Sequence, residues 1–83
     1  MPSESMISPA QIRAARGLLD WSRQDLSEAS GVGQSTIADY EKKRRPSILS
    51  ENMRKIVAAF SEHGVEFTEA DKEHGAGVRW RKP

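Results

Sequence analysis

The chain has 83 residues, of which 36% are hydrophobic and 30% charged, and its formal net charge is +1. This length accommodates one small domain and excludes a separate catalytic or effector-binding module. Because there is no cysteine, disulfides and thiolate metal sites are also excluded.

Membrane insertion and secretion are not expected. The apolar stretches are too short to cross a bilayer, and residues 1–7 lack a basic segment followed by an apolar run. We therefore expect a cytoplasmic protein. The slight positive charge is weak evidence for nucleic-acid binding, but four of the 13 basic residues are consecutive, at 42–45, which indicates a local basic edge.

Residues 1–7 are expected to form a flexible arm before a first helix. Ser8 and Gln11 have the spacing of a capping box, with Pro9 at the first helical position. Gly17 is expected to help end this helix. Its apolar face comprises Ile12, Ala15, Leu18 and Leu19.

A second, short helix is predicted to begin after Ser22, which is a capping residue with Asp25 three positions later. Leu26 and Ala29 supply its apolar side. Gly31 is the expected left-handed stop. Trp21, just before this helix, is interpreted as a core or rim aromatic.

A third helix is predicted over residues 34–41, with Ile37 and Tyr40 facing inward. Pro46 breaks the chain after it, and Ser50 opens a fourth helix that closes at residues 63–64. The apolar positions of this fourth helix are Leu49, Met53, Ile56, Val57 and Phe60, which recur at helical spacing.

The last part of the chain changes its period from helical to alternating. Val65 and Phe67 alternate with polar residues, as do Val78 and Trp80 around the turn-rich segment 71–76. We expect a short β-hairpin, or strands that pair with another chain.

Two short helices joined by residues 31–33 are typical of a helix-turn-helix. The helices must cross closely, so the first turn residue needs a left-handed backbone that glycine adopts at low cost. Ala29, Val32 and Ile37 are expected to seal the corner. The N-terminal side chains of the third helix then project away from the body, toward base edges and phosphates.

Residues 18–41 have the sequence LLDWSRQDLSEASGVGQSTIADYE. This stretch resembles the Cro and phage-repressor (Xre) helix-turn-helix family, and the resemblance extends over residues 8–64. It implies a mainly α, lambda-repressor-like domain of four to five helices, here with the short C-terminal hairpin over residues 65–83. It also implies a transcriptional regulator, most simply a repressor, that binds a pseudo-palindromic operator in double-stranded DNA as a homodimer.

The resemblance also assigns DNA contacts. The side chains expected at base edges are Gln34, Ser35, Ala38 and Asp39. Those expected at phosphates are Arg23, Thr36, Lys43, Arg44 and Arg45. Ala38 offers only a methyl contact, and Asp39 must accept from cytosine N4 or be neutralised by a basic neighbour.

Other assignments remain open. The hairpin residues Val65, Phe67, Val78 and Trp80 are expected to dimerise, but the tail can also pack in cis or contact DNA through Arg79, Arg81 and Lys82. An alternative function is that of an antitoxin or antiactivator that binds a second regulatory protein.

Catalysis and cofactor binding are not expected. The chain shows no Ser-His-Asp set or phosphate-binding glycine loop, so we predict no enzymatic activity. His63 and His74 are too isolated to bind a metal, and no cofactor is expected. Arg13 and Arg16 are interpreted as solvent-facing.

Overall fold

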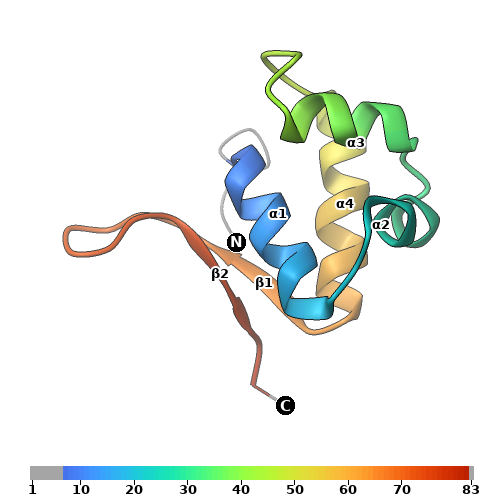
Figure 1. Cartoon of the computed structure of the whole chain (residues 1–83). Coiled ribbons are helices and arrows are strands. Elements are labelled where there is room, and N and C mark those ends of the chain that lie inside the picture. The colour runs from blue at the N-terminus through green and yellow to red at the C-terminus, as the bar shows by residue number, and fades with distance from the viewer. Residues whose placement is uncertain (1–6, 83) are drawn as a thin grey trace.

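The computed structural model describes residues 7–82, which form four helices followed by a two-stranded antiparallel sheet (Figure 1). The elements are α1 (Pro9–Leu19), α2 (Arg23–Ser30), α3 (Gln34–Glu41), α4 (Ser50–Glu62), β1 (Val65–Thr68) and β2 (Gly77–Trp80). This arrangement confirms the mainly α, lambda-repressor-like fold. Within this part of the chain, no helix has the length and apolar character needed to span a membrane. Residues 1–6 of the expected arm lie outside the described residues.

The N-termini of α1 and α2 are both fixed by capping boxes, at the two serines that the sequence predicts as caps. The Ser8 hydroxyl accepts from the Gln11 N–H at 3.2 Å, and the Gln11 side chain accepts from the Ser8 N–H at 2.8 Å. Ser22 and Asp25 make the same reciprocal pair at 3.0 and 2.9 Å. These bonds satisfy backbone donors that a helix cannot pair internally.

The end of α1 differs from the prediction. Gly17 lies inside the helix and is exposed, so it does not end the helix. Asp20 takes the left-handed conformation instead, with φ 57°, and its short polar side chain makes that conformation tolerable. The Trp21 N–H then bonds to the Arg16 carbonyl at 2.9 Å, which closes the last turn.

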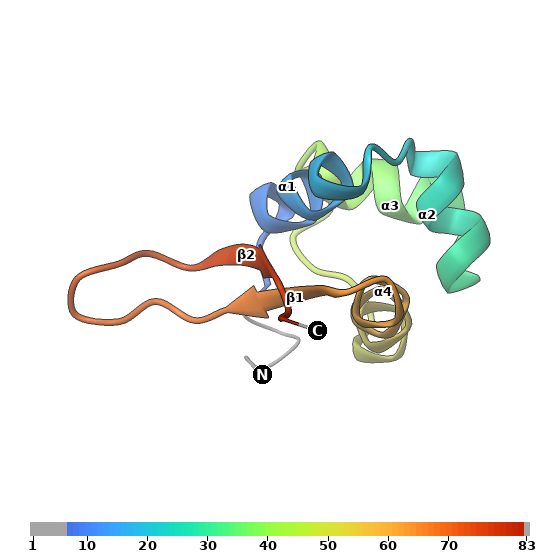
Figure 2. The ribbon, with the colours of Figure 1, turned by 90° about the horizontal axis from the view of Figure 1, so that it is seen from below.

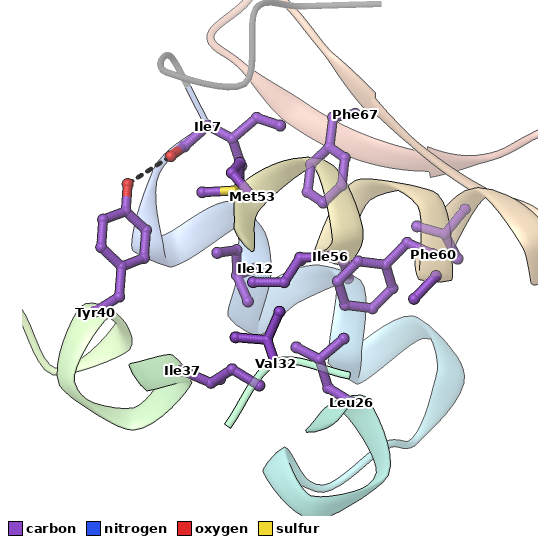
Figure 3. Close-up of a cluster of buried hydrophobic side chains, with 13 residues drawn as sticks. Ile7, Ile12, Leu26, Val32, Ile37, Tyr40, Met53, Ile56, Phe60 and Phe67 are labelled. Carbon is purple, nitrogen blue, oxygen red and sulfur yellow. Dashed lines mark hydrogen bonds between the residues drawn. The ribbon is translucent and has the colours of Figure 1, made fainter. Parts of the chain in front are cut away.

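The core lies between the helices and β1 (Figure 3). Val32 and Ile37 meet at the α2–α3 corner, as expected, and Leu26 joins them there. The buried apolar side chains are Ile7, Ile12, Ala15, Leu26, Val32, Ile37, Tyr40, Met53, Ile56, Ala59, Phe60, Val65 and Phe67.

Two of the expected core residues are exposed. Ala29 is exposed, so it does not seal the corner. Leu49 is 71% exposed and is the N-cap of α4, with a non-helical ψ of 138°. Its side chain therefore does not follow the helical spacing that places Met53 in the core. Trp21 packs on Phe60 with ring centroids 5.5 Å apart, as a rim aromatic.

The boundary of the expected N-terminal arm also needs correction at Ile7. This side chain is only 1% exposed, and its carbonyl oxygen accepts a 2.7 Å hydrogen bond from the Tyr40 hydroxyl. Burial raises the pKa of Tyr40 above its ordinary value. Ile7 therefore belongs to the folded domain and ties the start of the chain to α3.

The predicted hairpin is present, and its first strand completes the core of the helical domain. The register pairs Val65 with Trp80 and Phe67 with Val78, so these four side chains share one face of the sheet. The buried Gln11 amide donates to the carbonyls of Thr68 and Gly77 at 3.4 and 3.1 Å, which fixes the sheet against α1. Figure 2 shows the turn of the hairpin projecting away from the helices.

Candidate nucleic-acid interface

The α2–α3 corner has the geometry that a helix-turn-helix requires. Gly31 has φ 79°, and its N–H donates to the Ser27 carbonyl at 2.8 Å. Val32 follows as a buried turn residue that is 3% exposed. Gly33 gives α3 no side-chain cap, as the sequence indicates. The backbone donors at the start of α3 are therefore open to a ligand.

The two sides of α3 have different environments. Ile37, Tyr40 and Glu41 are buried against the rest of the domain. The expected base-contacting residues lie on the other side, where Gln34 and Ser35 are exposed and Ala38 and Asp39 are half-buried. Thr36, expected at a phosphate, is also half-buried.

A cleft of about 650 Å³ separates the N-terminus of α2 from that of α3. Gln34, Ser35 and Ala38 line it from α3, and Arg23 lines it from α2. The structure thus brings three expected base contacts together with one expected phosphate contact. The cleft is completed by Arg16, Ser22 and Gln24, which were not among the predicted site residues.

The buried carboxylate of Glu41 pairs with two arginines that line this cleft. The Glu41 side chain is fully shielded from solvent and receives Arg16 Nε at 2.9 Å and Arg16 Nη2 at 2.7 Å. Arg23 Nε approaches the same carboxylate at 3.3 Å. Arg13 donates to the backbone carbonyl of Glu41 at 2.8 Å. The prediction that Arg16 faces solvent is therefore wrong, because its side chain is only 17% exposed.

This cluster of Arg16, Arg23 and Glu41 carries two guanidinium charges and one carboxylate. One positive charge is left over, and Arg23, with 34% of its side chain exposed, presents it at the cleft. The sequence contained a signal for the buried carboxylate. Glu41 comes four residues after Ile37 and therefore lies on the buried face of the helix, where a charge needs a partner.

The C-terminus of α3 fixes the basic loop (residues 42–45). Lys43 has φ 60°; its N–H bonds to the Tyr40 carbonyl at 3.1 Å, and the Arg44 N–H bonds to the Asp39 carbonyl at 2.8 Å. These are the two bonds of a Schellman motif. All four basic side chains of the loop are exposed at the end of the helix. The expected phosphate contacts Lys43, Arg44 and Arg45 thus lie together beside α3.

The family assignment agrees with this geometry. The helix-turn-helix family model matches residues 12–67, which is more than half of the chain. The chain belongs to the Xre-type helix-turn-helix family. It is a DNA-binding regulator of transcription. No curated protein sequence matches it at a significant level.

The hairpin of this helix-turn-helix protein lies apart from the cleft. Val65 and Phe67 are 1% and 3% exposed in the chain's own core, so they present no surface to a partner. Val78 is half-buried, and Trp80 is 51% exposed. Of the four residues expected at a dimer interface, Trp80 is the one with a large accessible surface.

Two of the basic residues of the hairpin contact other residues of the chain. Arg79 Nε contacts Glu66 Oε1 at 2.6 Å, and Arg81 donates to the Ser61 carbonyl at 2.6 Å. His63 Nδ1 lies 2.9 Å from the Ala59 carbonyl, and His74 lies at the hairpin turn beside Asp71. Between residues 7 and 82, acidic and histidine side chains form no group suited to a metal ion.

Proposed function

We propose that this helix-turn-helix protein is a repressor that binds a pseudo-palindromic operator as a homodimer, with α3 in the major groove. The observation that carries the proposal is the exposed side of α3. Its N-terminal end borders a cleft with a net positive charge, and its C-terminal end carries the basic loop. A helix flanked in this way can read bases while its surroundings hold the two phosphate strands.

One DNA phosphate is expected in the cleft. Arg23 is anchored to Glu41 through Nε and lies at the N-terminus of α2, where backbone N–H groups lack helical partners. Because Arg16 already neutralises Glu41, the charge of Arg23 remains for an anion. The buried cluster thus pre-orients a phosphate-binding guanidinium and lowers the entropy lost on binding.

Base reading is assigned to the exposed residues of α3. Gln34 has the donor and acceptor pair that matches adenine N6 and N7. Ser35 is small enough to let the helix approach closely, and Ala38 offers a methyl group to thymine. With few polar base contacts, most of the affinity comes from phosphates and from the second subunit.

Dimer formation is assigned to the exposed Trp80 at the end of β2. An exposed tryptophan is a large apolar surface that a partner can cover. In residues 7–82 the sheet has two strands, so the outer edge of each strand has no strand beside it. A second copy docked there places two α3 helices on one DNA face, about 34 Å apart if the half-sites are one turn apart.

The same exposed Trp80 favours a second candidate function. In it, the hairpin binds another regulatory protein, and the chain acts as an antitoxin or antiactivator. A chain that stays monomeric and enriches no DNA sequence selects this candidate over the first.

The test of DNA recognition is a selection of bound duplexes from random sequence by the full chain. We expect an enriched site with two related half-sites and an affinity that falls steeply with salt, as phosphate contacts require. Recovery of unrelated sequences with no common site would contradict operator recognition.

The test of dimerisation is the mass of the full chain in solution against its concentration. We expect Trp80→Ser to weaken self-association and Leu49→Ser to leave it unchanged, since Leu49 is also exposed but lies at the other end of α4. Removing residues 65–83 is a poor substitute, because it strips the buried Val65 and Phe67 from the core. Equal dimerisation of both variants would show that the hairpin is not the dimer interface.

A further inference from the structure

Asp39 lies on α3 among the residues expected to read bases, and its carboxylate also contacts the basic loop. Asp39 Oδ2 is 3.5 Å from Arg45 Nη2, and Asp39 Oδ1 is 4.0 Å from Arg44 Nη1. These two arginines are the same residues that the proposed function assigns to DNA phosphates. One acidic side chain thus lies on the side of α3 proposed to enter the groove and contacts the groups meant for the DNA backbone.

The backbone makes this pairing a property of the fold. The Arg44 N–H is bonded to the Asp39 carbonyl at 2.8 Å within the Schellman motif. The two residues are therefore held together whichever rotamers their side chains adopt. The position after the left-handed Lys43 returns the chain beside the last turn of α3.

The pairing is weak enough to be exchanged. The side chains of Arg44 and Arg45 are 67% and 46% exposed, and that of Asp39 is 33% exposed. Ion pairs at such exposure contribute little because water screens them. A phosphate oxygen is chemically the same kind of acceptor as the carboxylate, so DNA competes directly for both guanidinium groups.

We propose that Asp39 is an internal competitor for DNA phosphate that couples base reading to backbone binding. On DNA without the matching cytosine, the Asp39 carboxylate stays paired with Arg44 and Arg45. Where a cytosine presents its N4 amino group, the carboxylate accepts a hydrogen bond from the base, and both arginines bind DNA phosphates instead. This inference rests on the proposed placement of α3 in the major groove.

Asp39 is then a specificity-determining residue whose main effect is on the affinity for DNA other than the operator. Its carboxylate lowers the affinity for sequences without the cytosine, because the arginines are then shared with Asp39. At the operator this cost is removed, because the base amino group replaces the arginines. Discrimination of this kind works by penalising competitors.

The experiment compares Asp39→Asn with wild type and with Glu69→Gln on a random duplex and on the selected operator. Both substitutions remove one negative charge, but Glu69 is exposed and directly follows β1, so it belongs to neither α3 nor the basic loop. We expect Asp39→Asn to bind random duplex about threefold to tenfold more tightly and with a steeper salt dependence. The ratio of operator to random affinity should fall by a similar factor, because Asn keeps an oxygen that accepts from cytosine.

Repeating the comparison in an Arg44→Ala, Arg45→Ala background isolates the pairing. There, Asp39→Asn should gain no more than Glu69→Gln does. An equal gain with and without the arginines would overturn the proposal, as would an Asp39→Asn variant that matches the control. These outcomes are distinct from a wild-type chain that binds no DNA, which would contradict the proposed function itself.

Discussion

Arg16 and Glu41 are separated by 25 residues, yet their side chains are joined by two hydrogen bonds of 2.9 and 2.7 Å. The pair connects α1 to the end of α3, and Arg23 from α2 approaches the same carboxylate. Three helices thus converge on one buried charge directly behind the cleft. The orientation of α3, the helix that we propose enters the major groove, therefore depends on an interaction on its buried side.

Breaking this pair should be costly. Glu41→Ala leaves the Arg16 guanidinium without its carboxylate in a site that is 17% exposed. We expect the free energy of unfolding, measured by urea denaturation, to fall by about 3–5 kcal/mol. Glu62→Ala, at an exposed position of α4, is the matched control and should change it by less than about 0.5 kcal/mol. Similar losses in both variants would show that the buried pair has no special weight.

Gln34 should read a base, and Gln24 should not. Both glutamines line the cleft, but Gln34 begins α3 and Gln24 belongs to α2. We expect Gln34→Ala to cost about 1–3 kcal/mol at the operator and to relax the preference at one base pair per half-site. Gln24→Ala should weaken all duplexes alike. Binding to operators with single base changes separates these patterns, and a uniform loss in Gln34→Ala argues against base reading.

The basic loop should account for part of the salt dependence at the operator. Replacing Arg44 and Arg45 with Ala should reduce the slope of log affinity against log salt by about one per lost contact. Arg79→Ala with Arg81→Ala is the comparison, because these two basic residues belong to the hairpin segment and not to the basic loop. A slope that falls only in the hairpin double variant would move the phosphate contacts from the basic loop to the hairpin.

The two glycines of the corner should respond differently to substitution. Neither has an atom within 4 Å of an added Cβ, so the backbone conformation alone decides the cost. Gly31, with φ 79°, should lose about 1–2 kcal/mol of stability on replacement by Ala. Gly33→Ser should be neutral or stabilising by a few tenths of a kcal/mol, because serine caps α3. Thermal unfolding of the two variants tests these expectations. A Gly31→Ala variant as stable as wild type would refute the requirement for glycine at this position.

Tyr40 should make the fold sensitive to high pH. Burial raises the pKa of this phenol above 10.0, so the folded state favours its neutral form. Its contribution to stability is complete below about pH 10, the unfolded value, and is lost as the pH rises through the higher folded pKa. The absorbance of tyrosinate measures the ionisation of Tyr40 directly, since the chain has one tyrosine. A titration midpoint at or below 10.0 contradicts the effect of burial, and Tyr40→Phe should remove the associated loss.

Local signals predicted the elements well because their causes are local. Capping boxes at Ser8 and Ser22 and the left-handed Gly31 each act within a few residues. Apart from the end of α1, which Asp20 and not Gly17 forms, the errors came at positions whose burial depends on tertiary packing. Ala29 and Leu49 fit the helical periodicity but face solvent, and Ile7 is buried because Tyr40 reaches it from α3.

The candidate site shows the same division. The exposed residues of α3 follow from the helix-turn-helix pattern, because the buried face of a short helix fixes its outer face. The partners of charged groups do not follow, because a long side chain can reach several neighbours. Arg16 and Arg23 both pair with Glu41, which is 25 and 18 residues away and which no short-range spacing specifies.

The sequence by itself determined the two crossed helices, the basic loop beside α3 and the alternating tail, since helical and strand periods are properties of consecutive residues. Only the tertiary structure decided that Val65 and Phe67 complete the core while Trp80 stays accessible, and that the cleft keeps one uncompensated positive charge. Those outcomes depend on which surfaces and charges meet across the fold. Contacts between residues distant in sequence therefore set the electrostatics of this helix-turn-helix protein.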